Sequence, residues 1–187
     1  MRGLASREQL RASLLRWALV CIPACLLLGY LSAMVASSGP DNPWFAALVK
    51  PSIYPPPAAF GIVWTVLYAL MGFALALVCA AWGARGRIAA IIAFGVQFAL
   101  NLAWSPVFFG LHRMSEALGI IVALAVAVAV TLWLFWRVRQ LAGLLLVPYL
   151  AWVLFAGVLN YQFLKMNPQA DGASDNGAAA ARVRIGE

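Results

Sequence analysis

The stretch "KPSIYPPPAAFGIVWTVLY" (Lys50 to Tyr68) places four prolines within seven residues, directly before a long apolar run. Proline fixes φ and has no N–H to donate, so this segment is stiff, extended and unable to continue a helix. The run that follows begins at Phe60 and contains no charged residue before Arg85. A continuous apolar run of this length is typical of a helix that crosses a bilayer. The sequence therefore predicts a rigid loop that leads into a membrane span.

The composition of the whole chain indicates the same environment. Of the 187 residues, 65% are hydrophobic and only 10% are charged, whereas a soluble domain carries about 25% charged residues. A chain of this size cannot bury so much apolar surface in one core, so lipid must cover part of it. The class is an integral membrane protein with one domain.

Five apolar runs are long enough to cross a bilayer, which takes about 20 residues each. They lie near 14–36, 60–82, 88–109, 117–136 and 141–165. The runs are continuously apolar rather than alternating, which argues against a barrel. Because most connections are short, consecutive spans should run antiparallel. We therefore expect an all-α integral membrane protein, a five-transmembrane-helix bundle with a long proline-rich loop between its first two helices.

The two ends of the chain differ in character from this domain, which covers 14–166. Residues 1–13 form a basic segment ahead of the first span. Residues 167–187 are small, polar and without periodicity, which predicts a disordered C-terminal tail.

The positive charges follow the topology of the spans. With five spans, eight Lys or Arg residues fall on the side of the N-terminus and five on the other side. The positive-inside rule then places the N-terminus inside. We expect a bacterial cell membrane by default, with an outer or organellar membrane left open. The net charge of +7 is thus explained without a basic face for nucleic acid.

Few side chains suit catalysis or metal binding. No Asp, Glu, Lys or Arg lies well inside a span, which argues against an ion-driven pump. His112 is the single histidine, and Cys21, Cys25 and Cys79 have no His or acidic neighbour at a ligand spacing. We predict no catalytic residue, no metal site and no cofactor.

Aromatic and amide side chains instead recur at helical spacing on three spans. They are Phe60, Trp64, Tyr68 and Met71; Gln97, Asn101, Trp104 and Phe108; and Tyr149, Trp152, Ala156, Asn160 and Phe163. One interpretation is a cavity with flat aromatic walls and amides that orient a ligand. The other is helix packing in which Asn joins neighbouring helices. Trp152 favours the cavity, because anchoring at the membrane surface does not explain an indole in mid-span.

Two weaker patterns concern partners. Gly95, Ala99 and Ala103 form a ladder of small residues, which allows close helix approach within the bundle or across a homodimer. "VLNYQFLK" (Val158 to Lys165) fits a loose sterol-binding pattern, but we favour a lysine that snorkels to the membrane surface as its explanation.

Four blocks together resemble one family. They are "WFAALVKPSIYPP" (Trp44 to Pro56), "FGIVWTVLYALMG" (Phe60 to Gly72), "QFALNLAWSPVFFG" (Gln97 to Gly110) and "PYLAWVLFAGVLNY" (Pro148 to Tyr161). In this order and spacing they resemble the TspO family, the tryptophan-rich sensory proteins whose eukaryotic members are the translocator protein, or peripheral-type benzodiazepine receptor. The resemblance implies a five-helix bundle, often dimeric.

The resemblance also implies a ligand and a site. The ligand class is tetrapyrroles such as protoporphyrin IX and heme, together with sterols and other hydrophobic molecules. The implied pocket residues are Phe60, Trp64, Asn101, Trp104, Trp152, Ala156, Leu159 and Asn160. The implied lid is the loop 51–57, with Pro51, Pro55 and Pro56, next to Lys50. That Lys50 meets a porphyrin carboxylate is our own inference, and the alternative is a lysine at the membrane surface. Ile53 and Ala58 stand where the family often has tryptophan, which weakens the lid's grip on a ring.

The expected function is that of a membrane receptor or carrier for tetrapyrroles, with a role in their transport or in regulating their synthesis. Two alternatives stay open at this point. One is an enzyme that degrades protoporphyrin IX in the light, and the other is a passive porphyrin transporter.

Overall fold

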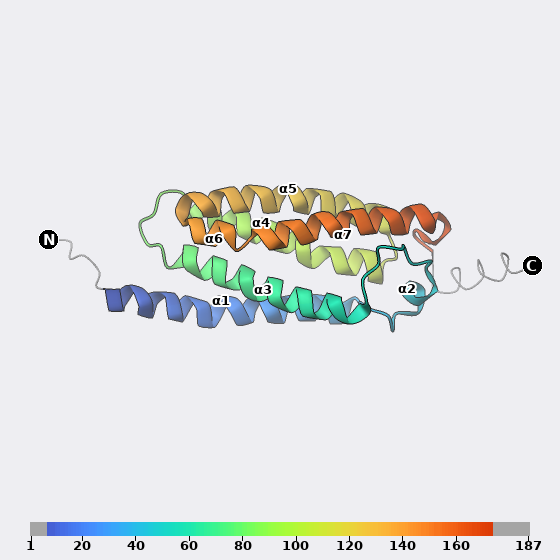
Figure 1. The fold of residues 1–187 in the computed structure, drawn as a ribbon, viewed down its shortest axis with the longest axis horizontal. Helices are drawn as coiled ribbons and strands as arrows, with labels where there is room; N and C mark the ends of the chain where they lie inside the picture. The colour runs from blue at the N-terminus through green and yellow to red at the C-terminus, as the bar shows by residue number, and fades with distance from the viewer. Residues whose placement is uncertain (1–6, 174–187) are drawn as a thin grey trace, which may run out of the picture.

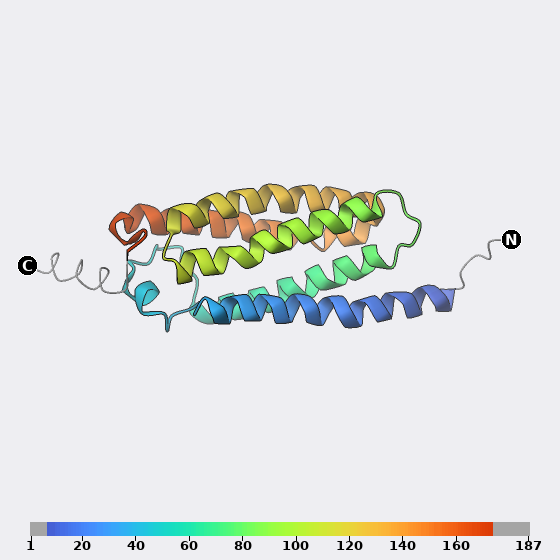
Figure 2. The same ribbon diagram turned by 180° about the vertical axis from the view of Figure 1, so that it is seen from behind.

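The computed structural model describes residues 7–173, and long helices lie side by side in it (Figures 1 and 2). They are α1 (Arg7–Val35), α3 (Pro57–Cys79), α4 (Arg87–Ser105) with the π-helical turn η1 (Pro106–Gly110), α5 (Met114–Val138), and α6 (Gln140–Leu144) with α7 (Val147–Met166). These make five segments long and apolar enough to cross a membrane. Residues 7–173 contain no strand. The prediction of an all-α, five-span membrane protein is confirmed.

The helices form two layers. The α1 helix packs along α3, whereas α5 packs against both α4 and α7, and both views show these two groups (Figures 1 and 2). The α3 helix meets the second layer mainly through α4 and α6, and it contacts α7 only sparsely. Space between the layers is therefore left where α3 faces α7.

Glycines set how closely the first layer packs. A Cβ on Gly72 would lie 2.6 Å from the Ile22 Cα atom, and a Cβ on Gly29 would lie 2.3 Å from the ring of Tyr68. No real side chain fits at such distances, so only glycine lets α1 and α3 approach this far.

Two prolines shape the second layer. Pro106 has no N–H for the carbonyl of Leu102, and the Ser32 hydroxyl of α1 donates to that carbonyl at 2.7 Å instead. Pro148 follows a break at 145–146, so the last span is two helices rather than the single one expected over 141–165. A proline ring clashes with the carbonyl four residues earlier, which explains why α6 ends at Leu144.

The long loop contains a short helix, α2 (Pro43–Ala47), which the sequence did not suggest. The Asn42 side chain caps it by accepting from the Phe45 N–H at 3.0 Å. Trp44 and Phe45 are buried, and the Trp44 indole donates to the Ala170 carbonyl at 3.2 Å. Packing as well as proline stiffness therefore holds this loop.

The beginning of the expected disordered tail is ordered, which corrects that prediction for 167–173. The Asn167 side chain accepts from the Val49 N–H at 2.7 Å and donates to the Val49 carbonyl at 3.0 Å. The turn η2 (Pro168–Ala170) follows, and Asp171 accepts from the Ser115 N–H at the start of α5. These polar contacts are long-range, so no local periodicity announces them. Residues 174–187 lie outside the described residues.

The N-terminal boundary also differs from the expected one. The first helix begins at Arg7 rather than near residue 14, so half of the predicted basic segment 1–13 is helical. Residues 1–6 lie outside the described residues.

Basic and indole side chains gather at the bundle end where α1 begins. The Arg87 guanidinium lies 4.3 Å from the Trp82 ring centre, and that of Arg137 lies 5.0 Å from the Trp133 ring centre. Exposed Trp with Arg suits a membrane surface. The orientation across the membrane stays a prediction.

Candidate functional site

A cavity of about 740 Å³ lies between the two layers, in the half of the bundle next to the long loop. Its walls come from α1, α3, the α4–η1 segment, α7 and the loop. The volume falls within the range of about 300–1,000 Å³ that ligand pockets occupy.

The structure brings most of the predicted pocket residues to this cavity. Those that line it are Phe60, Trp64, Trp104, Trp152, Ala156, Leu159 and Asn160. Asn101 does not line it. The Asn101 side chain lies behind the wall and accepts a hydrogen bond at 2.8 Å from the hydroxyl of Tyr68, which does line the cavity.

Stacked aromatic pairs on the two layers give the cavity flat surfaces. On α3, the rings of Trp64 and Tyr68 stack with centres 5.2 Å apart and planes at 28°. On the α4–η1 segment, Trp104 and Phe108 stack at 4.9 Å and 20°. Flat walls of this kind suit a flat, largely apolar ligand.

Asn160 combines the two roles that the sequence left open. Its side chain accepts from the Trp104 indole at 3.2 Å and donates to the Met114 carbonyl at 3.0 Å. The amide thus connects α7 to α4 and to the first turn of α5, and it also lies in the cavity wall. The Asn160 side chain therefore serves both helix packing and cavity lining.

The cavity wall carries no formal charge within the described residues. At the loop end, the ammonium of Lys50 donates to the carbonyls of Phe45 and Leu48. It also lies 4.2 Å from the ring centre of Phe45, a residue of the cavity wall. Lys50 therefore stands directly behind the wall rather than inside the cavity.

The loop 51–57 reaches the cavity, but not through the four residues named for the lid. Lys50, Pro51, Pro55 and Pro56 are not in the lining, which instead takes Ser38, Gly39, Pro40, Phe45, Tyr54 and Pro57. Burial raises the pKa of Tyr54, so this phenol stays a neutral donor near pH 7. Pro51 instead begins a turn that the Tyr54 N–H closes by donating to the Pro51 carbonyl at 2.9 Å, and Pro56 directly precedes α3.

The α1 wall is the part of the cavity that sequence reasoning missed. It consists of Leu26, Leu27, Gly29, Tyr30 and Ala33. These residues carry no polar pattern, so they look like any lipid-facing run. The one available signal was Gly29, since glycine in a span often marks a close approach.

Trp152 has two distinctive properties. Its ring lines the cavity and also a groove on the outside of the bundle. Its indole nitrogen is buried, with no hydrogen-bond acceptor in the part of the chain that the structure describes. A buried donor without a partner is uncommon and calls for an explanation.

These features define a class: a five-span membrane protein with a ligand-sized, aromatic-walled cavity between its helices. A model of the TspO/MBR family matches residues 21–166, and the chain therefore belongs to that family. It is 39% identical over 150 residues to the tryptophan-rich protein TspO of Chlorobaculum tepidum, covering 80% of this chain and 94% of that one.

Two other relatives are similar over a large part of the chain. The protein CrtK of Rhodobacter capsulatus is 37% identical over 78% of this chain and 89% of its own. The human translocator protein is 42% identical over 63% of this chain and 71% of its own. Membership of this family supports a membrane receptor or regulatory role.

Proposed function

We propose that this protein is a membrane receptor or carrier that binds tetrapyrroles such as protoporphyrin IX and heme in the cavity. The observation that carries the proposal is the pair of aromatic stacks, Trp64 on Tyr68 and Trp104 on Phe108, around a space of about 740 Å³. Apolar ring faces that cover a flat macrocycle gain binding energy from buried area and from ring–ring contact.

The charge distribution suggests how a porphyrin lies in the cavity. Its ring takes the uncharged interior, because a carboxylate buried there without a partner would cost several kcal/mol or more. Its two carboxylates point to the loop end, towards the Tyr54 hydroxyl and the Lys50 ammonium. Lys50 reaches them by giving up its bonds to the Phe45 and Leu48 carbonyls.

Uncharged hydrophobic ligands such as sterols suit the same interior. In contrast, the stretch Val158 to Lys165, which fits the sterol pattern, would leave a bound sterol largely uncovered. Its Tyr161 and Lys165 are exposed on the outer face of α7. A sterol is therefore better accommodated in the cavity than along this stretch.

One observation favours a second function, the light-dependent breakdown of protoporphyrin IX. Trp64 and Tyr68 stack at the cavity wall, which places two oxidisable rings beside a bound chromophore. Illumination of the purified protein with the porphyrin tests this function. Loss of the Soret band beyond that of free porphyrin, abolished in Trp152→Phe, supports an enzyme, whereas loss equal to the free-porphyrin control rejects it.

Fluorescence titration with protoporphyrin IX tests the binding proposal. Wild type should show saturable quenching, and Trp152→Leu should weaken binding about tenfold, the effect of losing roughly 1.4 kcal/mol of contact. Trp133→Leu is the matched control, because that indole is 56% exposed and far from the cavity wall. Equal affinity in all three proteins would place the porphyrin elsewhere.

A further inference from the structure

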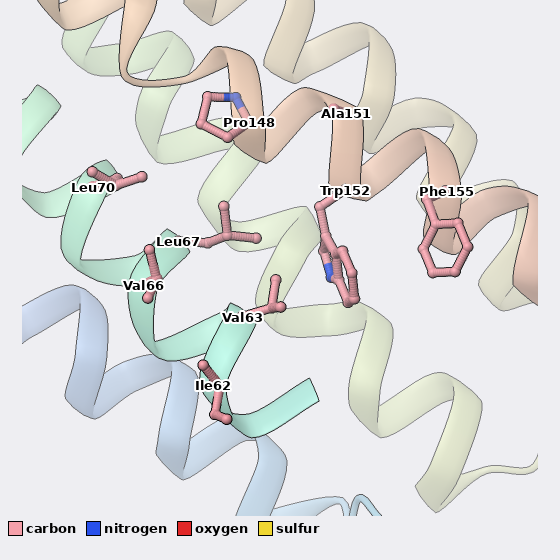
Figure 3. A pocket seen from close by; sticks show the side chains of 9 residues that line it. All are labelled: Ile62, Val63, Val66, Leu67, Leu70, Pro148, Ala151, Trp152 and Phe155. Atoms are coloured by element: carbon pink, nitrogen blue, oxygen red, sulfur yellow. The ribbon is translucent and has the colours of Figure 1, made fainter. Parts of the chain in front are cut away.

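A second hollow, the α3–α7 groove, lies on the outside of the bundle and has a volume of about 460 Å³. One side is formed by α3 with Val63, Val66 and Leu70, and the other by α7 with Pro148, Ala151 and Trp152 (Figure 3). It exists because α3 turns to α4 and α6 and barely contacts α7. The groove is distinct from the cavity, and Trp152 is the wall between them.

The depth of the groove determines its surroundings. Val66 lies near the middle of the span Pro57–Cys79, and Ala151 lies near the middle of the span Gln140–Met166. The groove is therefore at mid-bilayer, where lipid headgroups and water do not reach. Whatever fills it must be uncharged and mostly apolar, because a charged group at this depth is costly.

The groove side chains have one polar atom, the indole nitrogen of Trp152. Figure 3 shows this nitrogen on the edge of the ring that faces α3. It is buried and has no acceptor in residues 7–173, so an oxygen brought by a ligand would complete its hydrogen bonding. A turn of the ring is needed, since surrounding side chains now cover the nitrogen.

We propose that the α3–α7 groove is a binding site for an elongated, uncharged aliphatic chain that carries a carbonyl oxygen. The chain lies between Val66 and Ala151, and its oxygen accepts from the Trp152 indole. This site does not rest on tetrapyrrole binding in the cavity. It places a lipid-soluble molecule against the same ring that a cavity ligand touches from the other side.

Contact quenching in nanodiscs tests the groove. The probe is a fatty acid methyl ester with bromines at mid-chain, which quenches tryptophan on contact. The share of fluorescence that belongs to Trp152 is the difference between wild type and Trp152→Phe. We expect saturable quenching of this share, with affinity reduced about tenfold in Ala151→Phe and in Val66→Phe, which fill the groove from opposite sides.

Val158→Phe is the matched control, because Val158 is 52% exposed on the same helix and lines neither hollow. It should leave the quenching unchanged. Quenching that rises linearly with probe, or that is equal in the groove-filling and control variants, would overturn the proposal.

Two comparisons complete the test. The ester should bind about fivefold more tightly than the matching brominated alkane, the effect of one hydrogen bond, and equal affinity would overturn the role of the indole. Ala151→Phe should still bind protoporphyrin IX. If no variant and no wild-type protein bound the porphyrin while the ester still bound saturably, the proposed function would fail and the groove would stand.

Discussion

At the scale of single residues, Asn160 shows how one amide serves both packing and site. It satisfies the Trp104 indole and the Met114 carbonyl at once, and it is buried. In lipid, as in a dry core, a buried polar group without a partner costs free energy.

Asn160→Leu should therefore destabilise the fold. The change leaves the Trp104 indole N–H without its acceptor, which costs about 1–3 kcal/mol. It also removes the bond from Asn160 to the Met114 carbonyl, although that carbonyl keeps its helical partner in α5. Thermal unfolding in detergent should show a clear drop in Tm. Tyr161→Leu, at a neighbouring residue that is 53% exposed, serves as control and should unfold like wild type. A Tm unchanged by Asn160→Leu would mean that water or lipid replaces the amide.

At the scale of elements, the contact of α1 with α3 shapes the cavity. Gly29→Ala would drive a methyl group into the Tyr68 ring, 2.3 Å away. Tyr68 would have to move, which disturbs its stack on Trp64 and its bond to Asn101. We expect weaker porphyrin binding, about fivefold or more, together with a lower Tm.

Gly95→Ala is the matched control for this change. A Cβ there meets nothing within 4 Å, so alanine should be neutral or slightly stabilising through its helix propensity. Equal binding by the two alanine variants would show that α1 does not set the cavity wall.

A second contact at this scale joins the long loop to residues 167–173. Asn167→Ala removes both hydrogen bonds to Val49. Hydrogen exchange of the loop, residues 36–56, should become faster by roughly tenfold, because local opening costs less. Gln169→Ala is the control, because it changes an exposed side chain and should leave hydrogen exchange as in wild type. Wild-type exchange in Asn167→Ala as well would show that the loop is stable without its bonds to Asn167.

The elements also show what could be predicted from sequence. Spans follow from apolar runs, and the faces with Trp64, Trp104 and Trp152 follow from helical spacing, so these features are visible locally. The contact of Trp44 with Ala170 joins residues 126 positions apart, and no local pattern encodes it. The α1 wall was missed for a related reason: its residues are as apolar as lipid-facing ones.

At the scale of the whole molecule, the ladder of small residues on α4 faces outward. Gly95, Ala99 and Ala103 are all exposed, so the ladder does not serve packing within the chain. This exposure is compatible with a homodimer face, and the homodimer stays a prediction.

Ala99→Trp should therefore reduce dimerisation, because a bulky ring prevents close backbone approach. Cross-linking in nanodiscs should show at least about a tenfold loss of the dimer. Val122→Trp, on α5 and 58% exposed, should not change the cross-linking. An equal amount of cross-linked dimer in the two variants would exclude this face of α4 as the dimer interface.

The central claim for the whole molecule is that the space between the layers holds the ligand. Filling that space tests the claim most directly. Ala156 lines the cavity, and Ala151 lies five residues earlier on α7 and lines only the outer groove. In a titration with protoporphyrin IX, Ala156→Trp should abolish saturable binding, and Ala151→Trp should keep the wild-type Kd. A wild-type Kd in Ala156→Trp would contradict the account.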